Sequence, residues 1–253
     1  GQDLVEWQLR VASGETLPLK QEELKINGWA MEARLYAENP ETGFLPSTGA
    51  LHRFMTPQAA RVDTAFASGG EVSPHYDPMI AKIIISAATR AEAVEKLADA
   101  CAELETYPLV SNAGFLVQCL KEPDFVAGQV DTAFIGERLA GLTTKPEPSD
   151  ALVRQAAWNL AGPSRGEHAD EQTRDDPWAS WPTRGFRLNA SPHTQIRLRW
   201  RDHVYSAEPA VRGTWAWHGD GSVTCFQNGE AYEFTLDTGE RSADEATAGD
   251  GAI

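Results

Sequence analysis

The chain has 253 residues and a net charge of −15 at pH 7, with 42% hydrophobic and 23% charged residues. This length and composition predict two modest globular domains and exclude a chain that is disordered throughout. The negative charge would repel phosphate backbones and anionic lipids, and no apolar run approaches the roughly 18 residues that cross a bilayer, so we expect neither nucleic acid nor a membrane as a partner.

The three cysteines, Cys101, Cys119 and Cys225, are widely spaced along the chain. Their number and spacing predict neither a disulfide framework nor a zinc ribbon, and we expect no metal site. Free thiols suit a reducing compartment. Because the first residues also lack the basic start of a signal peptide, we expect a cytoplasmic protein, or one of the mitochondrial matrix in a eukaryote.

A strand with one polar face is the first predicted element that could hold chemistry. Residues 29–36 have the composition of a strand, and a period of two places Glu32, Arg34 and Tyr36 on one face. The other face is apolar: Met31, Ala33 and Leu35.

Shorter elements surround this strand. Asp3 can cap a helix that runs to about Gly14, and the Pro- and Gly-rich residues 39–49 predict a loop. Further short strands are expected at residues 50–54, 60–64 and 80–86.

Three helices are predicted behind these strands. Thr89 and Glu92 form a capping box that opens the first helix. Its apolar stripe at helical spacing is Val94, Leu97, Ala98, Cys101 and Leu104. Ser111 or Asn112 can cap a second helix, which carries Cys119 and ends at Pro123. Both of these helix cysteines are therefore expected in the core.

The third helix closes the first domain. Asp131 or Thr132 can cap it, and its apolar positions are Phe134, Ile135 and Leu139. Strands at the front with helices behind them are typical of the α+β class, so we expect an antiparallel sheet with helices over residues 1–142.

The second half of the chain has a different pattern. Residues 143–176 predict a linker that contains a short apolar helix at 150–161, between a Pro-rich stretch and a charged loop. Residues 177–237 predict a small antiparallel β-barrel-like domain, with which the helix can pack, and residues 238–253 predict an acidic linker. The strongest hairpin signal is Asn228-Gly229.

One strand of the second domain alternates cleanly. Residues 194–200 place Ile196, Leu198 and Trp200 inward, with Arg197 and Arg199 outward. Six arginines lie between positions 184 and 212. We interpret them as residues of solvated strand faces, and a patch that faces a partner is the alternative interpretation. The tryptophans of this domain are expected in its core, and a position in an interface is the alternative: Trp200, Trp215 and Trp217.

Several catalytic signatures are absent from the sequence. There is no Walker-type phosphate loop, no histidine pair at metal-ligand spacing and no Gly-x-Ser-x-Gly elbow. Side-chain chemistry alone therefore does not indicate an activity.

Four ordered segments carry a resemblance to a known family. Residues 1–8, 32–40, 44–49 and 76–82 resemble, in order and at the right separations, the C-terminal part of biotin carboxylase. The later segment from 176–178 through 187–189 resembles the subunit-docking (BT) domain of acyl-CoA carboxylase α subunits of the 3-methylcrotonyl-CoA or geranyl-CoA type. The resemblance implies a biotin-dependent ligase that forms carbon–carbon bonds.

The resemblance implies a role for Arg34. In biotin carboxylases, ATP activates bicarbonate, and negative charge develops on the ureido oxygen of biotin as its nitrogen captures the released CO2. Arg34 matches the family arginine that stabilises this charge, since a guanidinium does so without losing its own proton. The alternative is an ordinary strand arginine paired with Glu32, which stabilises little when exposed.

Three further residues are candidates for the biotin pocket or for dimer contacts: Glu32, Tyr76 and Asp77. The last two lie in a turn between Pro74 and Pro78. An Asp that bonds to its own turn backbone is an equally good interpretation.

The resemblance also implies cofactors and partners outside the chain. Biotin is expected on a carrier domain after residue 253, because Lys82 is followed by an apolar strand and not by the methionine of an acceptor motif. The ATP-grasp lobe, which binds Mg-ATP in the family, is expected before residue 1, so no ATP-binding residue is expected within the chain and the chain alone is predicted to be inactive.

The expected partners are a carboxyltransferase β subunit, the chain's own carrier and ATP-grasp domains, and a second copy through the biotin carboxylase part. Two alternatives stay open at this stage. One is the α subunit of a propionyl-CoA or acetyl-CoA carboxylase, and the other is a non-catalytic docking and assembly module.

Overall fold

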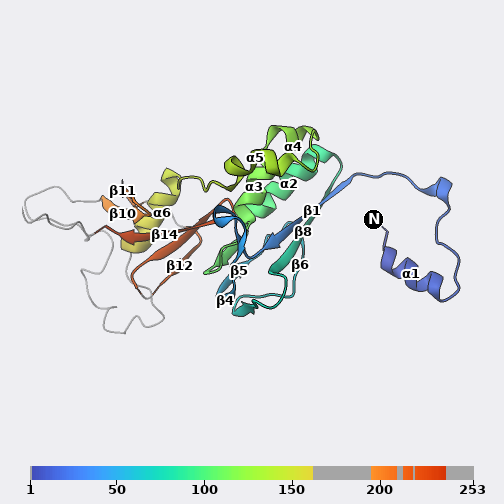
Figure 1. Cartoon of the computed structure of the whole chain (residues 1–253), viewed down its shortest axis with the longest axis horizontal. Coiled ribbons are helices and arrows are strands. Elements are labelled where there is room, and N and C mark those ends of the chain that lie inside the picture. Colours follow the sequence, from blue (N-terminus) through green and yellow to red (C-terminus); the bar gives the residue numbers. More distant parts are fainter. Residues whose placement is uncertain (1, 162–194, 210–212, 219, 238–253) are drawn as a thin grey trace, which may run out of the picture.

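The computed structural model describes residues 2–161, 195–209, 213–218 and 220–237, which form an N-terminal helical segment, an α+β part and a β-rich part (Figure 1). The predicted charged loop at 162–176, the docking-domain segments around 176–189 and the acidic tail lie outside these residues. No helix in the described ranges is both long and apolar enough to cross a membrane.

The N-terminal segment begins with helix α1, Leu4–Ala12. The Asp3 carboxylate accepts hydrogen bonds from the backbone N–H groups of Val5 and Glu6, at 3.1 and 3.0 Å, which confirms the predicted cap. A one-turn 3-10 helix follows at Gln21–Glu23. Figure 1 shows α1 standing apart from the rest of the molecule, joined to it by extended chain.

A three-stranded antiparallel sheet is the centre of the α+β part, with the strand order β1-β8-β6. Its strands are Trp29–Tyr36 (β1), Met79–Ala87 (β8) and Arg61–Asp63 (β6). Side chains alternate along β1 as predicted, since Ala33 and Leu35 are buried while Glu32 and Arg34 are exposed. The apolar face packs on helix α2.

Three pairs of very short strands extend this part. They are Glu38–Asn39 (β2) with Leu45–Pro46 (β3), Gly49–Leu51 (β4) with Gly70–Val72 (β7), and Arg53–Met55 (β5) with Glu105–Tyr107 (β9). The expected single strand at 50–54 is therefore wrong, because the chain changes partner at His52. The expected loop at 39–49 also contains β2, β3 and a 3-10 turn at Pro40–Thr42.

Helix α2, Arg90–Ala102, forms as predicted. The Thr89 hydroxyl accepts from the Glu92 N–H at 3.2 Å, and Cys101 is fully buried with the rest of the predicted stripe. Helix α3, Ala113–Lys121, packs beside α2. Cys119 on α3 is buried as well, which confirms that both helix cysteines belong to the core.

The helices after α3 differ from the sequence prediction in two respects. Pro123 is not only the end of α3, since it is also the first residue of helix α4, Pro123–Ala127, a position that tolerates the missing N–H. In helix α5, Phe134–Thr143, the buried residues are Phe134 and Leu142. The predicted apolar positions Ile135 and Leu139 are 45% and 41% exposed, because only one narrow side of α5 contacts the core.

The β-rich part is an antiparallel sheet covered by helix α6, Asp150–Ala161. The strands are Ile196–Trp200 (β10), His203–Ala207 (β11), Trp215–Trp217 (β12), Val223–Gln227 (β13) and Glu230–Leu236 (β14), in the order β11-β10-β14-β13-β12. Among the described residues no pairing joins β11 to β12, so these five strands form an open sheet and the predicted barrel is not confirmed.

The core of the β-rich part lies between α6 and the sheet. Leu152, Val153, Ala156, Ala157 and Leu160 are buried from the helix, and Leu198, Trp200, Val223, Tyr232 and Phe234 are buried from the sheet. The predicted alternation along β10 is confirmed, with Leu198 and Trp200 inward. The core assignment holds for Trp200 and for the half-buried Trp215, and the side chain of Trp217 lies outside the described residues.

Candidate functional site

The polar face of β1 holds the predicted site residues Glu32 and Arg34. Their side chains lie on the same side, with 3.5 Å between the Arg34 Nε and the Glu32 Oε1 atoms. The Arg34 side chain is 61% exposed. A hydrogen bond with the side chain of Tyr36, and then one with Glu32, hold the pKa of Arg34 above its usual value. The guanidinium is thus permanently charged, accessible and oriented by two neighbours.

Charged residues of the neighbouring strands extend this face. In the sheet register Arg34 lies opposite Lys82 on β8, and Lys82 lies opposite Asp63 on β6. Asp63 accepts two hydrogen bonds of 2.9 Å from Arg61, which lowers the pKa of its carboxyl, and Lys82 lowers it further. Lys82 is half-buried within the sheet and is not at an exposed hairpin tip, as its apolar flank predicted.

Tyr76 and Asp77 lie in the turn that leads into β8. Tyr76 is 82% exposed. The Asp77 Oδ1 atom accepts from the Met79 N–H at 3.0 Å, which is the turn geometry of the alternative interpretation. The Ala37 N–H donates to the Pro78 carbonyl at 2.9 Å, so this turn lies near the end of β1. Burial and then the charge of Asp77 raise the pKa of Glu38 there. No described hydrogen bond or ion pair connects Tyr76 or Asp77 with Arg34.

Asn112 is a buried residue of this region that was, with Ser111, one of two predicted caps of α3. It occupies the predicted N-cap position of α3, but its side chain makes no capping hydrogen bond there. It bonds instead to the backbone of Arg34 and Tyr36 on β1, and it is buried. No local sequence signal separates such an Asn from a helix cap, because both roles begin with an Asn before an apolar helix.

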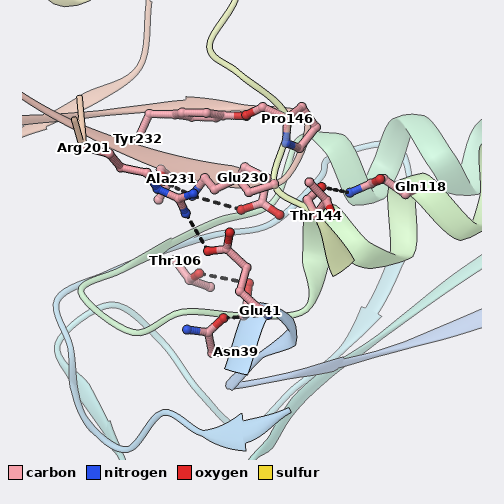
Figure 2. A network of polar contacts seen from close by, with 12 residues as sticks. Asn39, Glu41, Thr106, Gln118, Thr144, Pro146, Arg201, Glu230, Ala231 and Tyr232 are labelled. Carbon is pink, nitrogen blue, oxygen red and sulfur yellow. Dashed lines mark hydrogen bonds and ion pairs between the residues drawn. The ribbon is translucent and has the colours of Figure 1, made fainter. Parts of the chain in front are cut away.

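A second network of polar side chains joins the two parts of the molecule (Figure 2). Lys145 lies 3.1 Å from the Glu230 carboxylate, and both side chains are largely buried. Arg201, after β10, lies 2.6 Å from Glu41, which belongs to the α+β part. The Tyr232 hydroxyl donates to the carbonyl of Pro146 at 3.1 Å. The Arg201–Glu41 pair therefore crosses the boundary between the parts, and the Lys145–Glu230 pair joins the segment after α5 to the β-rich part.

The tip of the β13–β14 hairpin fits closely against the α+β part. Asn228 and Gly229 have φ angles of +53° and +73°, as the hairpin signal predicted. The Gly229 N–H donates to the carbonyl of Ala102 at 3.0 Å. A Cβ atom at Gly229 would lie 2.8 Å from the Cys101 carbonyl oxygen, and one at Gly114 of α3 would overlap the Glu230 carboxylate. Both glycines leave room for this contact.

The Pro-rich residues that predicted a linker are bound to the same hairpin. Lys145 donates to the carbonyl of Ala231, and the N–H and hydroxyl of Ser149 both contact the Gln227 amide oxygen, at 3.2 and 3.0 Å. The segment between α5 and α6 is thus held along its length by β13 and β14.

The described residues contain no cluster of three or more histidine, cysteine, aspartate or glutamate side chains that could hold a metal ion. Burial raises the pKa of each cysteine thiol to about 12. A thiol with this pKa is protonated at neutral pH and a poor nucleophile, so the cysteines are packing residues.

A family model, the biotin carboxylase C-terminal domain, matches residues 32–137. Residues 32–137 are a biotin carboxylase C-terminal domain. The match contains Glu32, Arg34, Tyr76, Asp77 and Asn112. The chain is also similar to the biotin carboxylase subunit of a pyruvate carboxylase of known structure, with a TM-score of 0.55 and 40% identity, over 58% of this chain and 33% of that one.

Two curated relatives extend this result. The mitochondrial methylcrotonoyl-CoA carboxylase subunit alpha of Dictyostelium discoideum is 40% identical over 207 residues, which is 80% of this chain and 29% of the relative. The propionyl-CoA carboxylase alpha chain of Ruegeria pomeroyi is 42% identical over 159 residues, 54% of this chain and 23% of the relative. The chain thus spans less than a third of each of these relatives.

Substitution of Gly114 tests the contact between the biotin carboxylase C-terminal domain and the hairpin. Alanine is a better helix former than glycine, so Gly136→Ala on α5, where the space is open, is expected to stabilise the chain by up to about 1 kcal/mol. Gly114→Ala is expected to destabilise it by about 1–3 kcal/mol, because the methyl group displaces Glu230. Denaturant unfolding measures both values, and equal stabilisation by the two variants would show that the hairpin does not occupy this position.

Glu230 gives the network a predicted pH dependence. Burial outweighs the attraction of Lys145 and raises the pKa of Glu230 above 4.5, with Glu41 raising it further and Arg201 opposing. The folded state then binds more protons than the unfolded state, so this contribution to stability falls as pH rises from 4.5 through the raised pKa. Relative to Glu230→Gln, the free energy of unfolding of the wild type is expected to fall over that range. A relative increase would mean that Lys145 dominates and lowers the pKa.

Proposed function

We propose that the chain is part of the α subunit of an acyl-CoA carboxylase and contributes to the ATP- and bicarbonate-dependent carboxylation of biotin. One observation carries this proposal: Arg34 lies within the biotin carboxylase C-terminal domain, with its guanidinium on an open polar face. Biotin supplies the nitrogen that is carboxylated and the ureido oxygen that gains negative charge in the transition state.

The geometry around Arg34 suits the stabilisation of an oxyanion. The guanidinium is accessible, and its contacts with Glu32 and Tyr36 leave other N–H groups free to donate to a bound ligand. Lys82, opposite Arg34 in the sheet, adds a second positive charge to this face. A donor whose orientation is fixed before the reaction stabilises developing charge without reorganisation, which is the source of its catalytic effect.

Glu32, Tyr76 and Asp77 have less direct roles in this proposal. Glu32 orients Arg34 through the 3.5 Å contact. Tyr76 and Asp77 form an exposed turn, and we assign it to the rim of the biotin pocket or to contacts with a second copy of the domain. Mg-ATP is assigned to an ATP-grasp lobe outside the 253 residues, and biotin to a carrier domain that is also outside them.

A methylcrotonyl-CoA or geranyl-CoA substrate is favoured over propionyl-CoA. Two methylcrotonoyl-CoA carboxylase relatives match 80% of the chain and so extend beyond residue 142, whereas the propionyl-CoA relative matches 54%, a share close to the 53% of three further methylcrotonoyl-CoA relatives. This extension is informative because the resemblance to the 3-methylcrotonyl-CoA or geranyl-CoA type lies in the second half of the chain, whereas the biotin carboxylase part matches relatives of both types. Such an enzyme would act in leucine or isoprenoid catabolism, in the cytoplasm or the mitochondrial matrix.

For the β-rich part we propose docking onto a carboxyltransferase β subunit. Its strands and α6 bury an apolar core, and its described residues contain no metal cluster and no reactive thiol. A sheet without such groups is better suited to form a binding surface for another protein than to form an active site. Attachment of the sheet to the biotin carboxylase domain would hold two active sites at a fixed separation, which raises the effective concentration of a carrier that visits both.

Removal of the Arg34 guanidinium is the test of the catalytic proposal. In the full-length carboxylase, Arg34→Ala is expected to lower kcat for carboxylation of free biotin by on the order of a hundred- to a thousandfold, the usual effect of losing one oxyanion donor. Arg34→Lys should restore only part of the rate, because an ammonium lacks the planar donor fork. A wild-type rate in a folded Arg34→Ala enzyme would exclude the assignment.

The docking proposal is tested by capture of the carboxyltransferase β subunit. Residues 1–253 and residues 145–253 are expected to bind it, whereas residues 1–142 alone are not. If residues 1–142 bind as tightly as the whole chain, the docking surface belongs to the biotin carboxylase domain, and the β-rich part is a spacer.

A further inference from the structure

Asn112 links α3 to the outer edge of β1 at the residues that carry the polar face. The Asn112 Oδ1 atom accepts from the Tyr36 N–H at 2.9 Å, and its Nδ2 atom donates to the Arg34 carbonyl at 3.2 Å. The Asn112 backbone N–H donates to the Tyr36 carbonyl at 3.1 Å. In the described sheet β1 is an edge strand, so one side of its backbone has no neighbouring strand. At Arg34 and Tyr36, Asn112 alone supplies hydrogen bonds of the kind that a neighbouring strand would make.

These bonds span the irregular step in the pairing of β1 with β8. Arg34 and Leu35 lie opposite Lys82 and Ala81, but Tyr36 lies opposite Met79, so that Ile80 is passed over. A bulge of this kind changes the direction of the side chains beside it. Asn112 binds the backbone of both Arg34 and Tyr36 and therefore fixes the strand on the two sides of the shift.

Helix capping does not account for the position of Asn112. An Asn at an N-cap normally accepts a hydrogen bond from the first turn of its helix, but in α3 the side chain makes no such bond. Its amide is turned toward β1, where both of its polar atoms are used, and only 6% of the residue is exposed. The Asn112 side chain thus forms its hydrogen bonds with strand β1 and leaves the first turn of α3 without a side-chain cap.

We propose that Asn112 is a positioning residue that fixes the Arg34 guanidinium for the reaction, an inference that rests on the proposed function. The mechanism is local and acts through hydrogen bonds to the backbone of β1. Asn112 holds the backbone at Arg34 and at Tyr36 by hydrogen bonds, and this backbone sets the direction in which the Arg34 side chain leaves the strand toward its contact with Glu32. A displacement of about 1 Å at a reacting group costs as much as a hundredfold in rate, so loss of this restraint should be visible in kcat.

The first experiment measures carboxylation of free biotin by the full-length enzyme carrying Asn112→Asp. This variant keeps the size and the acceptor for Tyr36 but replaces the donor to Arg34 with an oxygen. We expect kcat to fall roughly ten- to a hundredfold while KM for ATP and bicarbonate changes by less than about threefold. In an Arg34→Ala background, Asn112→Asp should cause no further fall, since the residue acts through Arg34.

Ser111→Ala is the matched control. Ser111 precedes Asn112, is equally buried and accepts a hydrogen bond from Thr106 at 3.0 Å, but none of its described bonds reaches β1. Loss of the Ser111 hydroxyl should lower the stability of the protein but should not cause the fall in kcat that is expected for Asn112→Asp. Hydrogen exchange of the Tyr36 amide gives a readout independent of activity, and it should be faster in Asn112→Ser, which loses the acceptor for this N–H, but not in Ser111→Ala. Asn112→Ser, which can still cap a helix but is too short to reach β1, serves if Asn112→Asp does not fold.

The outcomes distinguish this inference from the proposed function. Wild-type activity of Arg34→Ala would refute the proposed function. An impaired Arg34→Ala enzyme with normal kcat in both Asn112 variants would refute the inference alone. Equal losses for Ser111→Ala and Asn112→Asp, or effects of Arg34 and Asn112 that multiply, would also overturn it, because Asn112 would then act on the fold and not through Arg34.

Discussion

The pairing of β1 with β8, which gives the sheet one apolar and one polar face, is the constraint on which the rest of the structure depends. Alternation along β1 buries Ala33 and Leu35 against α2 and leaves Glu32 and Arg34 on the open side. A shift of one residue in this register would bury the guanidinium and expose the core. The hydrophobic effect therefore fixes not only the sheet but also the side from which a ligand can reach Arg34.

The boundary between the two parts is stabilised in a different way. It depends on small residues and paired charges: Gly114 and Gly229 allow close approach, and Lys145 opposes the rise that burial causes in the pKa of Glu230. Buried pairs of this kind give little net stability, but loss of one partner is costly because the other is left uncompensated. The network thus favours one relative arrangement of the parts over others.

Much of the fold could be predicted from the sequence because its signals are local. The alternation in β1, the capping box of α2 and the Asn228-Gly229 hairpin each depend on a few neighbouring residues. The failures have non-local causes: β4 and β5 separate because their partners, β7 and β9, lie far along the chain. Ser111 or Asn112 was expected to cap a helix, and only the tertiary position of β1 shows which bonds Asn112 makes. Arg34 itself was found through resemblance, since its chemistry alone does not distinguish it from an ordinary strand arginine.

The segment from Lys145 to Ser149 has the composition of a flexible tether, but its contacts bind it in a fixed position on the β13–β14 hairpin. A tether accepts insertions at little cost in free energy, since the entropy of a loop grows only slowly with its length. Here Lys145, Pro146 and Ser149 each meet a particular atom of the β13–β14 hairpin. One inserted residue would move these groups out of step with the hairpin. Related chains of this architecture should therefore keep the length of this segment constant even where its sequence changes, and place their length variation elsewhere.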